Sequence, residues 1–190
     1  FAVDVASYMD VVTPELKKAG NVLVEMDIEK DENDIPVYEN VLYMYDLLNK
    51  KIKEGKIQSA YAVGFGGIIE AVSKMAFGNK LGVELEDTVS KKDLVAKNYG
   101  AIILEVKAAD LDQLGIPVKK IGKVTKEPVF TYKDVTITMD EALAAWTETL
   151  EKVFPTESNV PQTEIKTGLF DAKTVYTSRN KVAKPKVFIP

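Results

Sequence analysis

Residues 60–79 read AYAVGFGGIIEAVSKMAFGN and join a strand, a glycine-rich turn and a helix. The alternating apolar run over residues 57–63 predicts the strand. An apolar stripe at helical spacing predicts the helix, and it is formed by Ile68, Val72, Met75 and Ala76. Between them lie four candidate ligand-binding residues, Gly64, Phe65, Gly66 and Gly67. These four residues are the strongest local signal of function in the chain.

The glycine-rich turn allows two interpretations. Glycines ahead of a helix N-terminus let a phosphate approach unpaired backbone amides, so the turn is a candidate phosphate or substrate site. Alternatively, it is a tight strand-to-helix connection that needs unusual φ values. Its spacing fits neither the dinucleotide fingerprint nor a Walker loop, and no lysine follows directly.

Further strands are expected on both sides of this unit. The predicted strands cover residues 1–8, 22–28, 81–85, 100–106, 117–124, 128–132 and 135–138. One helix is expected to be capped by Asp34, with Pro36 in its first turn, and to end at Gly55. Thr138 and Glu141 form a capping box that opens another helix. Early alternation of strands and helices, followed by clustered short strands, predicts an α+β fold: a mixed β-sheet sandwich with helices.

Two polar or aromatic features bear on function. In the strand at 22–28, Glu25 and Asp27 lie on the face opposite Val24, as in a half-buried strand; the alternative is a pair of ligands for a divalent cation. Trp146 lies on an apolar helical stripe, which predicts a core position for its indole ring.

The composition excludes several classes of mechanism. The 190 residues contain no cysteine and no histidine, which removes thiolate chemistry, a Ser-His-Asp triad and most zinc sites. A net charge of −4 argues against nucleic-acid binding. No apolar run reaches the ~18 residues that span a bilayer. We therefore expect no nucleic-acid or membrane partner and no metal site.

The chain divides into three segments by composition. Residues 1–155 read as one folded domain. Residues 156–186 have few large apolar side chains and an excess of lysine, which predicts a linker or tail. Residues 187–190 resemble the first half of a buried strand, and we interpret them as the start of a further domain that is cut away.

Several motifs, taken in order, resemble one family. Residues 60–79 resemble the strand, Gly-Gly turn and helix of C-terminal domains in the aminoimidazole ribonucleotide synthetase superfamily. Residues 12–17 (VTPELK), 116–125 (IPVKKIGKVT) and 146–156 (WTETLEKVFPT) are similar to segments of phosphoribosylformylglycinamidine synthase. Residues 184–190 (KPKVFIP) look like the lead into the glutaminase domain of its single-chain form.

The resemblance implies a fragment of a cytoplasmic enzyme of de novo purine biosynthesis. The parent enzyme uses ATP, with Mg²⁺, and glutamine to convert formylglycinamide ribonucleotide to the amidine. The fragment itself would hold no cofactor, carry no catalytic residue and be inactive alone. Its implied partners are the N-terminal ATP-binding domains, the glutaminase domain and the ribonucleotide substrate. It would line the substrate cleft through Gly64, Phe65, Gly66 and Gly67.

Two alternatives stay open at this level. The chain could be a non-catalytic scaffold domain of the same enzyme, or the C-terminal domain of another superfamily member, of the thiamine monophosphate kinase or selenophosphate synthetase type. One departure bears on the site. Many relatives carry Asp before the Gly-Gly pair and His-Asp just upstream, whereas this chain has Phe65 and the pair Ala62 and Val63. The resemblance thus implies a contact through the backbone amides of Gly66 and Gly67.

Overall fold

The computed structural model describes residues 5–155 and Thr174. The chain separates into two compact units, Phe1–Phe154 and Pro155–Pro190, and the fold below is that of the first. The predicted tail and the predicted start of a further domain therefore lie outside the described residues, apart from Thr174. The strand predicted over residues 1–8 is wrong in its described part, because Val5 is exposed and Tyr8–Asp10 form a 3-10 helix, η1.

One mixed sheet organises the first unit. Its strands are β1 (Val22–Met26), β2 (Ile57–Ala62), β3 (Gly82–Leu85), β4 (Ile102–Val106), β5 (Lys119–Thr125), β6 (Val129–Tyr132) and β7 (Val135–Thr138). Their order in the sheet is β2-β4-β1-β5-β3-β6-β7. Neighbouring strands are antiparallel except β3 and β6, which run parallel. The predicted α+β class with a mixed sheet is confirmed.

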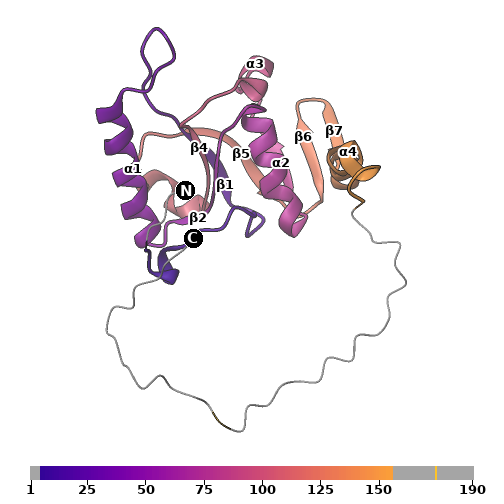
Figure 1. The fold of residues 1–190 in the computed structure, drawn as a ribbon, viewed down its shortest axis with the longest axis horizontal. Helices are drawn as coiled ribbons and strands as arrows, with labels where there is room; N and C mark the ends of the chain where they lie inside the picture. The colour runs from indigo at the N-terminus through magenta and orange to yellow at the C-terminus, as the bar shows by residue number, and fades with distance from the viewer. Residues whose placement is uncertain (1–4, 156–173, 175–190) are drawn as a thin grey trace. The chain divides into compact units, whose positions relative to one another are not determined.

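Helices cover both faces of this sheet (Figure 1). They are α1 (Tyr38–Lys53), α2 (Gly67–Asn79), α3 (Lys91–Val95) and α4 (Met139–Glu151), with a second 3-10 helix, η2 (Ala108–Gln113). The cap predicted for α1 is wrong: Asp34 has φ +62° and Pro36 bridges to Lys30, so the helix begins only at Tyr38. The capping box of Thr138 and Glu141 at the start of α4 is confirmed.

The central strand β1 is buried along its whole length. Its residues Val24 and Met26 pack with α1 on one face, while Leu23 packs with α2 on the other. Because β4 and β5 flank β1 and a helix covers each face, the expected half-buried strand is wrong. Glu25 is consequently only 8% exposed.

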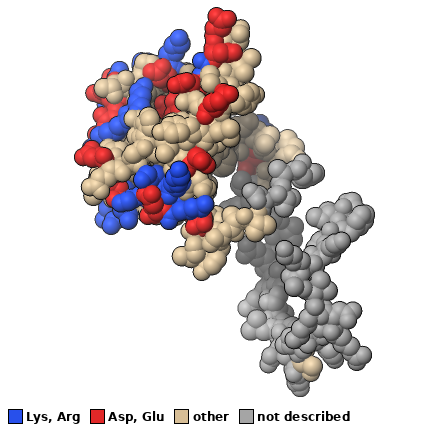
Figure 2. Space-filling view, turned by 90° about the vertical axis from the view of Figure 1, so that its left-hand side faces the viewer, with Lys and Arg blue, Asp and Glu red and all other residues tan. Residues whose placement is uncertain are grey.

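The helix α4 lies over β7 at the end of the sheet (Figure 1) and buries little of its apolar stripe. Trp146 is 57% exposed, so the predicted core position is wrong. Its ring instead stacks on Phe77 of α2, with centroids 5.4 Å apart and planes at 27°. Over the described residues, no helix combines the length and apolar character that crossing a bilayer requires. On the face in Figure 2, acidic and lysine side chains are interspersed rather than separated by sign.

Candidate functional site

The glycine turn connects the end of β2 to the start of α2. Gly67 has φ +72°, and a Cβ atom built there would lie 2.7 Å from the carbonyl oxygen of Leu94 and 2.8 Å from that of Ala96. No other residue type fits this position without displacing the backbone at the end of α3. Close packing of α2 against α3 therefore accounts for this glycine without any ligand.

Two amides of the turn, those of Gly66 and Gly67, are engaged by the chain itself. The Gly66 N–H donates to Glu70 Oε2 at 2.7 Å, and the Gly67 N–H to the Gly64 carbonyl at 3.4 Å. Lys74 Nζ lies 2.5 Å from the other Glu70 oxygen. The Lys74 ammonium, followed by the Gly66 amide, holds the pKa of Glu70 below its ordinary value. Glu70 thus takes the position that an anion would occupy at this helix N-terminus.

Phe65 is 79% exposed, at the place where relatives were expected to carry an acid. Sequence reasoning did not single out Glu70. Its signal was the spacing: Glu70 follows Gly66 by four residues and precedes Lys74 by four.

A cavity of about 620 Å³ lies beside the first turn of α2, because Ile68 is part of its wall. The other walls come from the end of β1 and the loop after it, from α3 and its following loop, and from the start of β5. The lining residues are Glu25, Asp27, Lys30, Asp34, Ile68, Asp93, Ala96, Lys97, Asn98, Pro117, Val118 and Lys119. Segments from four separate parts of the chain thus meet at one polar depression.

Asn98 links the acidic residues of this wall. Its Nδ2 donates to Glu25 Oε1 and to Asp27 Oδ1, both at 3.1 Å. Its Oδ1 accepts a hydrogen bond from Lys30 Nζ. The structure therefore brings the predicted pair Glu25 and Asp27 together through an amide that the sequence alone had not indicated.

Burial raises the pKa of Glu25, against the opposing effect of the Asn98 hydrogen bond. Asp27 adds a smaller increase through its negative charge. Within the described part of the chain, no three acidic side chains group together in a way that could hold a metal ion. The cavity geometry accordingly gives no support to the divalent-cation alternative.

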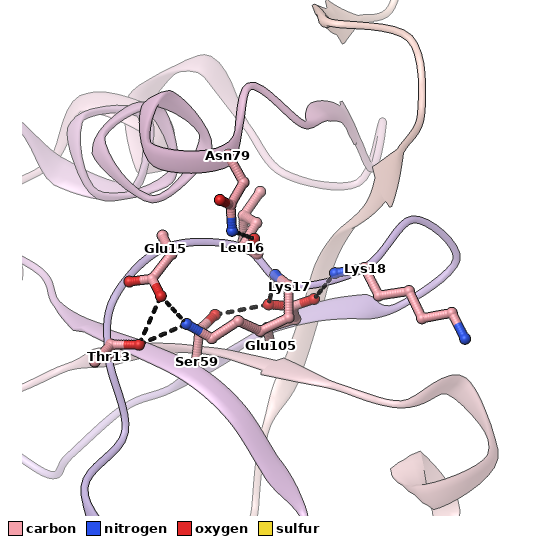
Figure 3. A network of polar contacts seen from close by, with 8 residues as sticks. All are labelled: Thr13, Glu15, Leu16, Lys17, Lys18, Ser59, Asn79 and Glu105. Carbon is pink, nitrogen blue, oxygen red and sulfur yellow. Dashed lines mark hydrogen bonds and ion pairs between the residues drawn. The ribbon is translucent and has the colours of Figure 1, made fainter.

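A second buried carboxylate, Glu105 of β4, is fully inaccessible and has a different environment (Figure 3). It accepts hydrogen bonds from Lys17 N at 2.8 Å, Lys18 N at 3.1 Å, Asn21 Nδ2 at 2.7 Å and Ser59 Oγ at 2.8 Å. These bonds attach the VTPELK segment to the sheet. Glu105 is therefore a structural anchor rather than a ligand-binding group.

The VTPELK segment is also tied to α2 and within itself. Asn79 Nδ2 donates to the Leu16 carbonyl at 2.8 Å, and Leu16 is completely buried. Hydrogen bonds from Lys17 and Thr13 lower the pKa of Glu15 to about 2. This motif holds loops in place, and none of its side chains lines the cavity.

The chain is similar in sequence to PurL proteins. No family model matches it. Phosphoribosylformylglycinamidine synthase subunit PurL of Sulfurovum sp. (strain NBC37-1) is 29% identical in an alignment over 123 residues, and the alignment covers 60% of this chain and 16% of that protein. PurL of Pelagibacter ubique (strain HTCC1062) is 24% identical over 178 residues, covering 77% of this chain and 24% of that protein.

Solved structures share the fold. PurLQS from Thermotoga maritima superposes with a TM-score of 0.62 at 14% identity, over 87% of this chain and 32% of that one. This chain therefore corresponds to only a part of each relative. The comparisons agree with the resemblance: this chain is similar in sequence to a portion of PurL, and it shares the fold of solved PurL structures.

Proposed function

We propose that the chain is the substrate-cleft domain of a phosphoribosylformylglycinamidine synthase. The whole enzyme would use ATP, Mg²⁺ and glutamine to convert formylglycinamide ribonucleotide to the amidine, and this domain would catalyse nothing alone. The observation that carries the proposal is the PurL match over 123 residues, in a chain that also has the PurL fold. Solved T. maritima PurL structures include complexes with ATP and with FGAR, formylglycinamide ribonucleotide. These complexes support a nucleotide and a ribonucleotide as ligands of the relatives.

Within this domain, we assign the cleft contact to Gly64, Phe65, Gly66 and Gly67 and the cavity beside them. A phosphate group would reach the Gly66 amide only by displacing the Glu70 carboxylate, which lies 2.7 Å from it. The exposed Phe65 ring offers an apolar contact and no acid. The role proposed for the turn is therefore binding and not proton transfer.

The proposed partners are domains of the same enzyme. They are the N-terminal ATP-binding domains and a glutaminase domain that supplies ammonia in the cytoplasm. The T. maritima relative named PurLQS supports an assembly of this kind. The chain itself carries no cysteine for a glutaminase nucleophile, so that chemistry would belong to another domain.

The proposal is tested by complementation of a purine auxotroph that lacks this synthase. We expect the full gene to restore growth without added purines, and an in-frame deletion of residues 5–155 to abolish it. A full gene that fails to complement, although its protein accumulates, would remove the proposed activity.

A biochemical assay tests the statement that the domain is inactive alone. The 190-residue chain is given ATP, Mg²⁺, ammonia and formylglycinamide ribonucleotide, and we expect neither ADP nor amidine to form. Turnover that survives further purification would show that the chain is an enzyme in its own right. Saturable binding of the ribonucleotide without turnover would favour the cleft domain over the scaffold alternative.

A further inference from the structure

Glu25 combines burial with unused hydrogen-bonding capacity. It is 8% exposed, yet it lines the cavity of about 620 Å³. Among the described residues, the structure gives its carboxylate one hydrogen bond, from Asn98 Nδ2 to Oε1. No fully buried side-chain oxygen lacks a partner among the described residues, so the other oxygen, Oε2, is not itself sealed from solvent. Glu25 Oε2 is thus an acceptor on the cavity wall that lacks a protein donor among these residues.

Four of the other charged groups in the lining have partners. Asp27 Oδ1 accepts from Ile28 N at 2.8 Å and from Asn98, and Lys30 donates to Asn98 Oδ1. Lys119 of β5, which faces Glu25, lies 3.7 Å from Asp93 of α3. The cavity lining as a whole carries four carboxylates and three ammonium groups, a negative excess of one charge. Among the described residues Glu25 forms no ion pair, although the positive charge of Lys119 acts on it from the neighbouring strand.

The chemistry of the site narrows the ligand class. A metal ion would need further carboxylates at coordinating distance, and the described residues supply no such group. An amidinium cation is planar and presents two parallel N–H donors, which matches a carboxylate in a bidentate pair. Pro117, Val118 and Ile68 add an apolar wall for the carbon substituent.

We propose that this cavity binds the amidinium group of a small molecule, with Glu25 as its carboxylate partner. On the proposed function, and resting on it, the natural ligand is the amidine product. The substrate carries a neutral amide at the same position, so the site would distinguish product from substrate by charge.

The test uses the intact 190-residue chain and two matched probes, acetamidine and its neutral isostere acetamide. Each is titrated into ¹⁵N-labelled protein and followed by NMR. We expect acetamidine to shift the amide resonances of Glu25, Asn98 and Lys119 in a saturable way. Acetamide should bind at least about tenfold more weakly, because it lacks the charge-assisted hydrogen bonds. Equal affinity for the two probes would overturn the proposal without any variant being made.

Glu25→Gln keeps the shape of the side chain and removes its charge. We expect it to weaken acetamidine binding about tenfold or more while leaving the thermal unfolding of the chain cooperative. Glu84→Gln is the matched control, since Glu84 is an exposed strand residue paired with Lys123 and is not part of the cavity lining. It should leave the affinity unchanged. Unchanged acetamidine affinity in Glu25→Gln, or an equal loss in Glu84→Gln, would contradict the proposal.

The outcomes separate this inference from the proposed function. Failed complementation together with charge-selective, Glu25-dependent acetamidine binding would contradict the proposed synthase activity and support the amidinium site. Successful complementation together with equal binding of both probes would support the proposed synthase activity and contradict the amidinium site.

Discussion

Glu25 of β1 and Glu105 of β4 lie on the same face of the sheet, where Glu25 pairs with Ile103 and Glu105 pairs with Leu23. Both carboxylates are buried, but Glu105 accepts four hydrogen bonds from the protein. Glu25 accepts one among the described residues. The Glu105 carboxylate makes its hydrogen bonds within the fold, whereas the Glu25 carboxylate remains available on a cavity wall. This difference separates a stabilising residue from a candidate binding residue.

Glu105→Gln is expected to destabilise the chain by about 2–4 kcal/mol. Whichever way the Gln amide is turned, its NH₂ group faces a backbone N–H, that of Lys17 or that of Lys18, and neither can reverse its polarity. The measurement is the free energy of unfolding from urea titration. Ser59→Ala serves as the comparison, because it removes one donor and should cost only about 1 kcal/mol. Similar losses in the two variants would contradict the anchoring role of Glu105.

Glu25→Gln is expected to stabilise the chain at neutral pH by about 1 kcal/mol, because a buried charge with few partners is replaced by a neutral isostere. Burial raises the pKa of Glu25 above its ordinary 4.5, so folding favours the protonated form. The contribution of wild-type Glu25 is fully present below pH 4.5 and is lost as the pH rises through the higher folded-state pKa. The advantage of the variant should therefore be near zero below pH 4.5 and reach its full size once the pH exceeds the folded-state pKa.

The measurement is the free energy of unfolding of wild type and of Glu25→Gln across this pH range, which shows whether the advantage of the variant increases with pH. An advantage that is constant with pH would mean that the Glu25 carboxylate is not destabilised by burial.

Glu70→Ala is expected to cost about 1 kcal/mol at pH 7, as for the loss of a helix cap, because the Gly66 N–H loses its acceptor. The pKa of Glu70 is lowered in the folded chain, so this stabilisation is present above its ordinary value of 4.5 and is lost as the pH falls further. Glu148→Ala, at an exposed position within α4, controls for the change in helix propensity. An equal cost in both variants would show that the Gly66 contact contributes nothing.

Trp146 is the single tryptophan of the chain, so its fluorescence reports on α4 directly. With 57% of its surface exposed, its emission should be that of a solvated indole and be readily quenched by acrylamide. Trp146→Ala removes a stacked ring pair with Phe77 and should cost about 1 kcal/mol. Emission that is shielded from acrylamide would indicate that another part of the chain covers α4.

Prediction from the sequence worked where short-range interactions decide the structure. The strand-turn-helix over residues 57–79 and the capping box of Thr138 and Glu141 depend on neighbours a few positions apart, and both formed as expected. The start of α1 was missed because the left-handed backbone of Asp34 belongs to a turn. The assignment of Gly64, Phe65, Gly66 and Gly67 as ligand contacts stays a prediction.

By itself, the sequence determined the class of fold, most of its elements and the resemblance to the synthase. The reason is that periodicity, helix caps and motif order depend on residues that are close together in the sequence. Only the tertiary structure decided which carboxylates are buried and what they contact. Asn98 reaches Glu25 across 73 positions, and Lys17 reaches Glu105 across 88. Such contacts arise when distant segments pack on one sheet, and burial then sets the environment of each charge. For that reason Glu25 and Glu105, two glutamates in predicted strands, have different roles: Glu25 is a candidate ligand group and Glu105 is an anchor of the fold.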